Sequence, residues 1–234
     1  LLTAFREPFV IAGHSLRVTA SIGIAVHPHD GTTFSDLLKN ADTALHRAKQ
    51  DGRDTLCFYD REMNRATFER LVLETELRAA IQTGQLRAYF EPKVHLADGR
   101  PVGAEALVRW LHPEHGLIAP GRFIPIAEAS DLIVAVGNWM LEEVCRQLAA
   151  WRDAGLPALT IAVNLAARHF RDPRLVGRIQ SLLATYHVPA EVLELELTET
   201  TLIEVGPQTM DVLATLHQMG VGLAIDDFGT GYSS

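Results

Sequence analysis

The chain has 234 residues, of which 47% are hydrophobic and 21% charged, so it can form a packed core and is not an intrinsically disordered protein. Its formal net charge is −8 and the sequence contains no run of basic residues, so we expect no nucleic-acid partner. No stretch reaches the apolar length of a membrane span, no signal peptide is visible, and the two cysteines form no metal or redox motif, so we expect a cytoplasmic protein.

The first part of the chain has the pattern of an incomplete α+β domain. Residues 16–26 are rich in β-branched side chains and predict a strand. Apolar residues recur at helical spacing over 34–48, Gly52 ends that helix, and residues 55–59 predict a short strand. Because the chain starts at a leucine rather than a methionine, we expect residues 1–60 to be the end of a longer domain.

The remainder alternates between strands and helices after a helical connector over residues 61–84. Strands are predicted at 86–96, 104–110, 159–165, 192–199 and 221–228, and helices at 122–153, 173–186 and 207–219. This alternation indicates a parallel sheet or barrel. Five strands suit an unfinished (β/α)₈ barrel over residues 85–234 better than a completed open sheet, so we expect this end to be a cut as well.

Oxygen-bearing side chains lie near the carboxyl ends of the predicted strands, where barrels place their functional groups. They are Glu105, Asn164, Glu196, Asp226 and Asp227. Each acid taken alone is more simply a solvated carboxylate, but several in one barrel mouth would repel one another unless cations were bound. All-oxygen ligands favour Mg²⁺ or Mn²⁺ over Zn²⁺, and two adjacent aspartates suit a two-metal site that cleaves a phosphodiester.

The same residues carry a family resemblance. The segment Glu105–Arg109 (EALVR) resembles the signature of EAL-domain cyclic di-GMP phosphodiesterases. Asn164, the ExT motif of Glu196–Thr198 and the DDFG motif of Asp226–Gly229 follow in the family's order. The resemblance covers about residues 68–234, roughly the first two thirds of such a domain.

The resemblance implies a role for each of these residues. Glu105, Asn164, Glu196 and Asp226 would bind one metal ion, and Asp226 and Asp227 would engage the second. The four acids in this set would be the catalytic residues. The family's loop that couples metal binding to dimerisation would begin at residues 228–234, which implies a possible homodimer.

The resemblance also implies three substrate contacts. Arg109 would bind a phosphate and Leu107 would line the pocket. Glu91 stands where the family usually has a glutamine, and an ionised glutamate only accepts hydrogen bonds, so its contact with the ligand is altered. Ala166 replaces the family's usual serine, which removes a hydroxyl but no metal ligand.

The upstream segment resembles the end of a GGDEF (diguanylate cyclase) domain. The resemblance rests on residues 21–25 and 41–53 and assigns Lys49 and Arg53 to nucleotide phosphates. Their spacing of four would let both cations reach one anion from a helix end. A solvated helix end with basic residues that complement the dipole is an equally good explanation.

The leading hypothesis is therefore a tandem GGDEF–EAL signalling protein that hydrolyses cyclic di-GMP to pGpG with two Mg²⁺ or Mn²⁺ ions. A non-catalytic cyclic di-GMP receptor is the alternative, and an interaction scaffold is a third possibility. The family's later lysine, glutamate and glutamine would lie beyond Ser234, so we expect this piece alone to be inactive. We also expect it to be poorly stable, because an open barrel exposes an unpaired strand edge.

Overall fold

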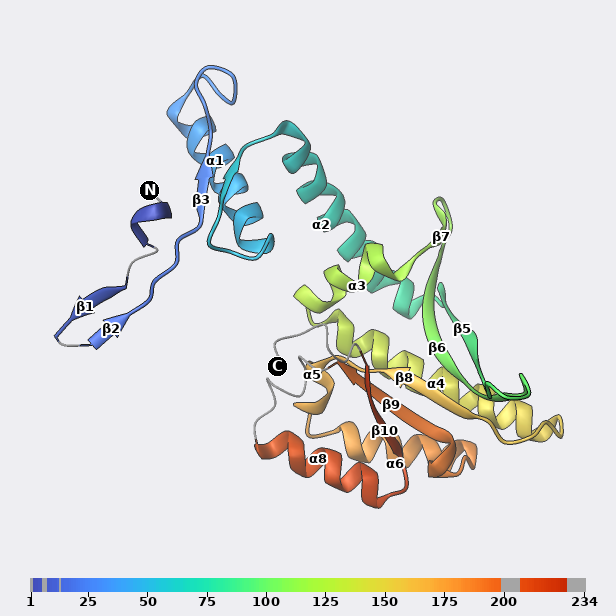
Figure 1. Cartoon of the computed structure of the whole chain (residues 1–234). Helices are drawn as coiled ribbons and strands as arrows, with labels where there is room; N and C mark the ends of the chain where they lie inside the picture. The colour runs from blue at the N-terminus through green and yellow to red at the C-terminus, as the bar shows by residue number, and fades with distance from the viewer. Residues whose placement is uncertain (1, 6–7, 13, 199–206, 227–234) are drawn as a thin grey trace. The chain divides into compact units, whose positions relative to one another are not determined.

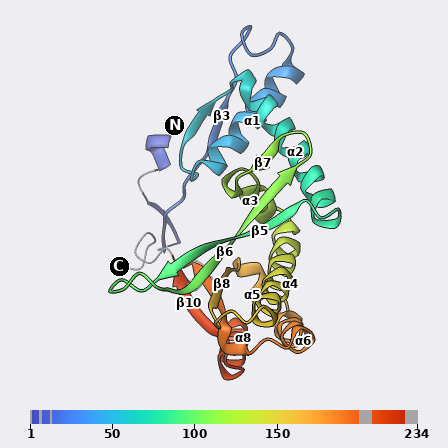
Figure 2. The same ribbon diagram turned by 90° about the vertical axis from the view of Figure 1, so that its right-hand side faces the viewer.

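The computed structural model describes residues 2–5, 8–12, 14–198 and 207–226 (Figures 1 and 2). The chain divides into two compact units, residues 1–72 and 73–234. Helix α2 (Arg61–Gln82) runs across that division, so the predicted connector is helical. The predicted domain limits at 60 and 84 stay a prediction.

The first unit contains two small two-stranded sheets and one long helix. Its elements are η1 (Leu2–Phe5), β1 (Phe9–Ile11), β2 (His14–Leu16), β3 (Ile22–Ile24), α1 (Phe34–Gln50) and β4 (Leu56–Phe58). Strands β1 and β2 form an antiparallel hairpin. Strands β3 and β4, which precede and follow α1 in the sequence, pair with each other in parallel. The prediction of one strand over 16–26 is wrong, because β2 and β3 pair with different partners and the chain leaves the ladder between them.

Helix α1 begins and ends where its sequence indicates. The Thr33 hydroxyl accepts a hydrogen bond from the backbone N–H of Asp36 (3.2 Å), which satisfies a free donor of the first turn. The helix ends at Gln50, directly before Asp51 and Gly52. It lies tightly on β3, because a Cβ added to Gly23 would overlap the backbone of Ala41. Glycine at that position therefore permits the helix–strand contact.

The second unit is built on a mixed sheet with the order β10-β9-β8-β6-β5, to which β7 adds by pairing with β6. Its strands are β5 (Leu86–Val94), β6 (Pro101–His112), β7 (Gly116–Ile118), β8 (Thr160–Asn164), β9 (Leu193–Thr198) and β10 (Gly222–Asp226). Its helices are α3 (Pro120–Ala129), α4 (Leu132–Asp153), α5 (Ala167–Phe170), α6 (Leu175–Tyr186), η2 (Ala190–Val192) and α8 (Pro207–Gln218).

Strands β6, β8, β9 and β10 are parallel, as the alternating pattern predicts. Strand β5 differs, because it pairs with β6 in antiparallel fashion. The connection over residues 95–100 is too short for the crossover that parallel pairing requires. It closes instead as a turn in which His95 N–H donates to the Arg100 carbonyl (2.9 Å), with Gly99 at φ 68°.

Two hydrophobic clusters hold this unit together. In the first, the parallel strands pack against α4, α6 and α8 through residues such as Leu141, Ile161, Ile179, Leu195 and Leu216. In the second, the far half of β6 packs against α2, α3 and the start of α4 around Leu77, Trp110 and Phe123. Figure 2 shows α4 and α6 along one side of the sheet. The opposite face of the sheet is therefore left for polar side chains.

The helix predicted over 122–153 is broken in two. Helix α3 ends at Ala129 and α4 begins at Leu132, because Ser130 adopts an extended backbone. The Ser130 hydroxyl donates to the Ile126 carbonyl (3.0 Å), so its side chain competes with the helical hydrogen bonds. Within the described residues, no helix combines the length and hydrophobicity that crossing a membrane requires.

Candidate functional site

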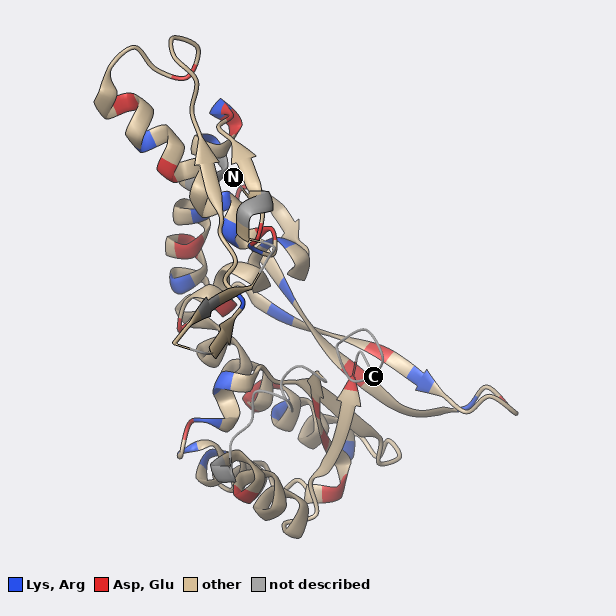
Figure 3. Ribbon diagram, turned by 60° about the vertical axis from the view of Figure 1, so that its left-hand side comes forward, with Lys and Arg blue, Asp and Glu red and all other residues tan. Residues whose placement is uncertain are grey.

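The polar face of the sheet follows from strand alternation. In β9, Leu193, Leu195 and Leu197 belong to the hydrophobic cluster, so Glu194, Glu196 and Thr198 occupy the other face. In β6, Ala104 and Ala106 are likewise in the cluster, which places Glu105, Leu107 and Arg109 opposite. Figure 3 shows acidic positions along the strands of this sheet.

The strand register brings the predicted metal ligands near one another. Glu105 lies beside Ala162 of β8, Asn164 beside Glu196, and Asp226 beside Thr198. These positions lie at or near the carboxyl ends of the parallel ladders. Glu105 is in the middle of β6, but the pairing of β6 with β8 ends one residue later, at Ala106. Four adjacent strands therefore present Glu105, Asn164, Glu196 and Asp226 on one face.

Glu105 is connected directly to Asn164. The Asn164 Nδ2 donates to Glu105 Oε1 over 2.6 Å. Burial raises the pKa of the Glu105 carboxyl, the hydrogen bond from Asn164 opposes that shift, and the charges of Glu196 and Asp226 add to it. The main cause of the raised pKa is thus burial, and the neighbouring carboxylates of Glu196 and Asp226 add a smaller effect in the same direction.

Glu196 is held by a lysine that sequence reasoning missed. The Lys93 Nζ lies 2.7 Å from Glu196 Oε1 and 3.1 Å from Glu194 Oε1. Burial acts to lower the pKa of Lys93, but its hydrogen bonds to Glu196 and Glu194 outweigh that effect and raise it. Alternation along β5 places Lys93 on the same face as Glu91, but only the long-range pairing of β5 with β6 brings that face to Glu196.

The predicted substrate-binding residues lie near the same face. The Arg109 guanidinium lies 5.7 Å from the centre of the Tyr89 ring, and its Nη1 donates to the Val108 carbonyl (3.0 Å). Glu91 is exposed and pairs directly across from Glu105 in the β5–β6 ladder. Asp226 is exposed at the end of β10, and Asp227 lies outside the described residues.

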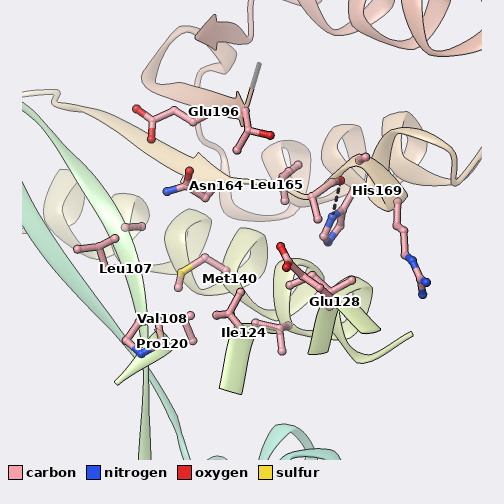
Figure 4. A pocket seen from close by; sticks show the side chains of 18 of the residues that line it. Leu107, Val108, Pro120, Ile124, Glu128, Met140, Asn164, Leu165, His169 and Glu196 are labelled. Atoms are coloured by element: carbon pink, nitrogen blue, oxygen red, sulfur yellow. Dashed lines mark hydrogen bonds between the residues drawn. The ribbon is translucent and has the colours of Figure 1, made fainter. Parts of the chain in front are cut away.

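A cavity of about 680 Å³ adjoins these groups (Figure 4). Leu107, Asn164 and Glu196 line it on the strand side, and α3, α4 and α5 contribute Ile124, Met140 and Arg168. The Arg168 guanidinium is held by the Asp131 carboxylate (2.8 Å) and the Ser130 carbonyl (3.0 Å). The cavity lining is thus largely apolar, with charged groups from β9 (Glu196) and from α3 and α5 (Glu128 and Arg168).

The donor set fits divalent metal ions in its chemistry. Three carboxylates and one amide supply only oxygen ligands, the type that Mg²⁺ and Mn²⁺ prefer. Among the described residues, no three acidic, histidine or cysteine side chains approach closely enough to enclose an ion. Two of the carboxylates instead have protein partners, Asn164 for Glu105 and Lys93 for Glu196.

The predicted nucleotide contacts of the first unit lie at the end of α1. Lys49 and Arg53 are both exposed, but Arg53 lies beyond the helix with φ 62°. The argument from helical spacing does not apply, because the helix ends at Gln50, between the two residues. Phosphate binding by this pair stays a prediction.

The comparison with known families decides the identity of the fold. Residues 74–234 match the EAL domain model, and residues 1–55 match the model of the diguanylate cyclase GGDEF domain. The chain belongs to the EAL domain family. The order of the two domains is the tandem order that the sequence predicts, which confirms the resemblance.

Individual relatives agree with the EAL assignment. The chain is 44% identical over 234 residues to the bifunctional diguanylate cyclase/cyclic di-GMP phosphodiesterase MucR of Pseudomonas aeruginosa, with 100% of this chain and 34% of MucR covered. It is 40% identical to the cyclic di-GMP phosphodiesterase PdeR of Escherichia coli, with 100% of this chain and 35% of PdeR covered. The chain thus spans about a third of the length of these relatives.

Solved structures of EAL domains resemble the second unit. A complex of PaMucR phosphodiesterase with c-di-GMP has a TM-score of 0.65 and 45% identity, and the match covers 69% of this chain and 66% of that one. The Xanthomonas citri FimX EAL domain with c-diGMP has a TM-score of 0.63 and 26% identity, over 71% and 65% of the two chains. The predicted TIM-type EAL fold is confirmed, although the sheet of the described residues is open.

Proposed function

We propose that this chain is part of a bacterial signalling protein whose EAL domain hydrolyses cyclic di-GMP to linear pGpG. The observation that carries the proposal is the placement of Glu105, Asn164, Glu196 and Asp226 on one face of four adjacent strands, beside a ligand-sized cavity. Relatives described as cyclic di-GMP phosphodiesterases support the choice of substrate.

Glu105, Asn164, Glu196 and Asp226 would hold one divalent cation, and Asp226 with Asp227 would hold a second. Two such ions, Mg²⁺ or Mn²⁺, supply Lewis-acid chemistry that polarises a phosphodiester and activates water. The gathering of three carboxylates on this face supports cation binding, because like charges at such positions repel one another. The ion type, the number of ions and the assignment of these ligands are parts of the proposal.

The residues of the chain would orient the substrate. Arg109 presents a planar guanidinium that suits two phosphate oxygens, and its contact with the exposed Tyr89 ring keeps it beside the polar face. Leu107, Ile124 and Met140 offer an apolar surface for a base next to the acidic site. A substrate whose phosphate binds Arg109 and whose base rests on this apolar surface would have its phosphodiester over Glu105 and Asn164.

Other parts of the proposal concern the surroundings of the enzyme. A homodimer formed through the EAL domain and a cytoplasmic location both stay predictions. In the first unit, Lys49 and Arg53 are the proposed contacts for a nucleotide phosphate.

The decisive experiment is to incubate the full-length protein with cyclic di-GMP and Mg²⁺ or Mn²⁺ and to separate the products chromatographically. Appearance of pGpG that a chelator blocks would support the phosphodiesterase. Tight binding without product would favour the receptor, a reading that the replacement of the family's glutamine by Glu91 leaves open. If the protein neither binds cyclic di-GMP nor forms pGpG, both the phosphodiesterase and the receptor are refuted.

A further inference from the structure

Lys93 occupies an unusual position beneath the acidic site. Its ammonium group lies between two carboxylates of β9, 2.7 Å from Glu196 Oε1 and 3.1 Å from Glu194 Oε1, although Lys93 and Glu196 are 103 residues apart in sequence. The Glu196 side chain is only 10% exposed, whereas that of Lys93 is 41% exposed. The lysine therefore reaches from a partly solvated position to a carboxylate that water scarcely reaches.

The fold of β5 directs Lys93 to this place. Strand β5 pairs antiparallel with β6, so Lys93 lies across from Gly103, two residues from the position where Glu91 faces Glu105. The ladder is irregular directly after Lys93, between Lys93 and Val94. Such irregularities often redirect a side chain next to a functional site.

Geometry limits how Glu196 can act. A carboxylate with one oxygen in a short, charge-assisted hydrogen bond is restricted in its rotation, and its other oxygen is the one that keeps both lone pairs for a metal ion. Glu194 fixes the lysine from the second side, so the cation cannot easily move away from Glu196. Glu194 thus contacts Lys93, and Lys93 contacts Glu196, the proposed metal ligand.

We propose that Lys93 is a positioning residue, which holds Glu196 through Oε1 so that a divalent cation can bind only the other oxygen of that carboxylate. The inference rests on the proposed function for its effect on turnover, but its effect on metal binding can be measured without turnover. Lys93 touches neither substrate nor reacting atoms in this scheme. It acts through Glu196 alone.

A purely structural ion pair makes a different prediction. If Lys93 only stabilised the sheet, its replacement would lower the melting temperature and leave metal binding by the folded protein unchanged. If Lys93 holds Glu196 as proposed, its loss frees a second oxygen for the metal and removes a nearby positive charge. Divalent cations would then bind more tightly, in a geometry less suited to turnover.

The test compares Lys93→Met and Lys93→Arg in the full-length protein, with Lys39→Met as the matched control on the exposed surface of α1. Free Mn²⁺ is measured by electron paramagnetic resonance during titration, and turnover of cyclic di-GMP is measured at saturating Mn²⁺. For Lys93→Met we expect the half-saturating Mn²⁺ concentration to fall about fivefold. We expect turnover to fall about tenfold, as for other partners of metal ligands.

Lys93→Arg keeps the charge and should retain wild-type Mn²⁺ affinity, as should Lys39→Met. If Lys93→Met does not fold, Lys93→Gln provides the second test, because it removes the positive charge but keeps a side chain that can donate a hydrogen bond to Glu196. It should shift Mn²⁺ affinity in the same direction by a smaller factor.

Unchanged or weaker Mn²⁺ binding by Lys93→Met would overturn the inference, as would a wild-type protein that binds no Mn²⁺. Tighter binding together with undiminished turnover would overturn it as well. If the wild-type protein binds Mn²⁺ but forms no pGpG, the proposed function fails. The Mn²⁺ titration alone then decides whether Lys93 controls Glu196.

Discussion

At the scale of single residues, Glu91 and Glu105 form an unfavourable pair. They lie directly opposite each other in the β5–β6 ladder and on the same face, and like charges at such positions repel. Glu91 also adds negative charge where a phosphodiester is proposed to bind. We expect Glu91→Gln to lower the KM for cyclic di-GMP about threefold, with little change in kcat.

Steady-state kinetics of the full-length protein measure this effect. Glu114→Gln is the matched control, because Glu114 is an exposed residue of the turn that follows β6. It makes the same change in charge away from the proposed site. An unchanged KM for Glu91→Gln would show that Glu91 does not act on the substrate, and a higher KM would show that it favours binding. Either result would contradict the expected repulsion.

Glu105 has a more central role in the proposed site. Its carboxylate accepts a hydrogen bond from Asn164 (2.6 Å) and would bind a metal ion. We expect Glu105→Ala to lower turnover more than about a hundredfold, since even partners of metal ligands cost up to that factor. Chromatographic detection of pGpG, with Glu114→Ala as control, checks this expectation, and near-normal turnover would contradict it.

The site could be predicted in part because strand alternation is visible in sequence. The leucines of β9 mark one face, so Glu196 had to lie on the other, and the short motifs placed Glu105 and Asn164 beside it. Lys93 could not be found in the same way. Its contact with Glu196 depends on the antiparallel pairing of β5 with β6, a long-range feature that the local pattern does not contain.

At the scale of elements, α4 carries a glycine that sequence reasoning passed over. A Cβ added to Gly137 would overlap the imidazole of His169, which is only 1% exposed. Burial lowers the pKa of His169, and its Nδ1 is 3.1 Å from the Ala166 carbonyl. The glycine therefore makes room for the ring that supports the segment after Asn164.

We expect Gly137→Ala to destabilise the second unit by about 1–3 kcal/mol through overpacking. Gly177→Ala in α6 is the matched control, because nothing lies within 4 Å of the added Cβ. Its higher helix propensity should stabilise by up to about 1 kcal/mol. Urea unfolding followed by tryptophan fluorescence distinguishes the two, and equal stability of Gly137→Ala and wild type would contradict the overlap.

The start of α6 provides a pH-dependent prediction. Hydrogen bonds from the Arg174 side chain, followed by the one from its backbone N–H, lower the pKa of Asp172 from 3.8 to about 2. Because the pKa of the folded protein is depressed, this stabilisation is present above pH 3.8 and is lost as the pH falls through about 2. Asp172 is partly solvated, so we expect its contribution to be modest.

We therefore expect Asp172→Asn to reduce stability by about 1 kcal/mol at neutral pH and by progressively less in acid. Urea midpoints measured from neutral pH down to about pH 2 check the trend. Asp211→Asn, an exposed change in α8, serves as the control and should show no such convergence. A difference between Asp172→Asn and wild type that grows in acid would have the wrong sign.

The limits of elements were less predictable than their types. Helices α1, α2, α6 and α8 begin and end close to the predicted positions, because periodicity and helix-ending residues are local signals. The break at Ser130 and the short α5 were missed. Both depend on how the chain turns around the cavity, which apolar spacing alone does not specify.

At the scale of the whole molecule, the two units differ in the size of their cores. Among the described residues of the first unit, the buried hydrophobic side chains are Ala44, Ala48 and Tyr59, while Phe34 is 81% exposed. The second unit has two extensive hydrophobic clusters. Since stability follows buried apolar surface, the first unit should unfold at lower denaturant concentration.

All three tryptophans, Trp110, Trp139 and Trp151, lie in the second unit, and each is at least partly buried. Tryptophan fluorescence therefore reports on that unit alone, whereas far-ultraviolet circular dichroism reports on the helices of both. We expect urea unfolding of the 234-residue chain to give a lower midpoint by circular dichroism than by fluorescence. Coincident transitions would mean that the first unit draws its stability from the second, and that the two unfold as one cooperative body.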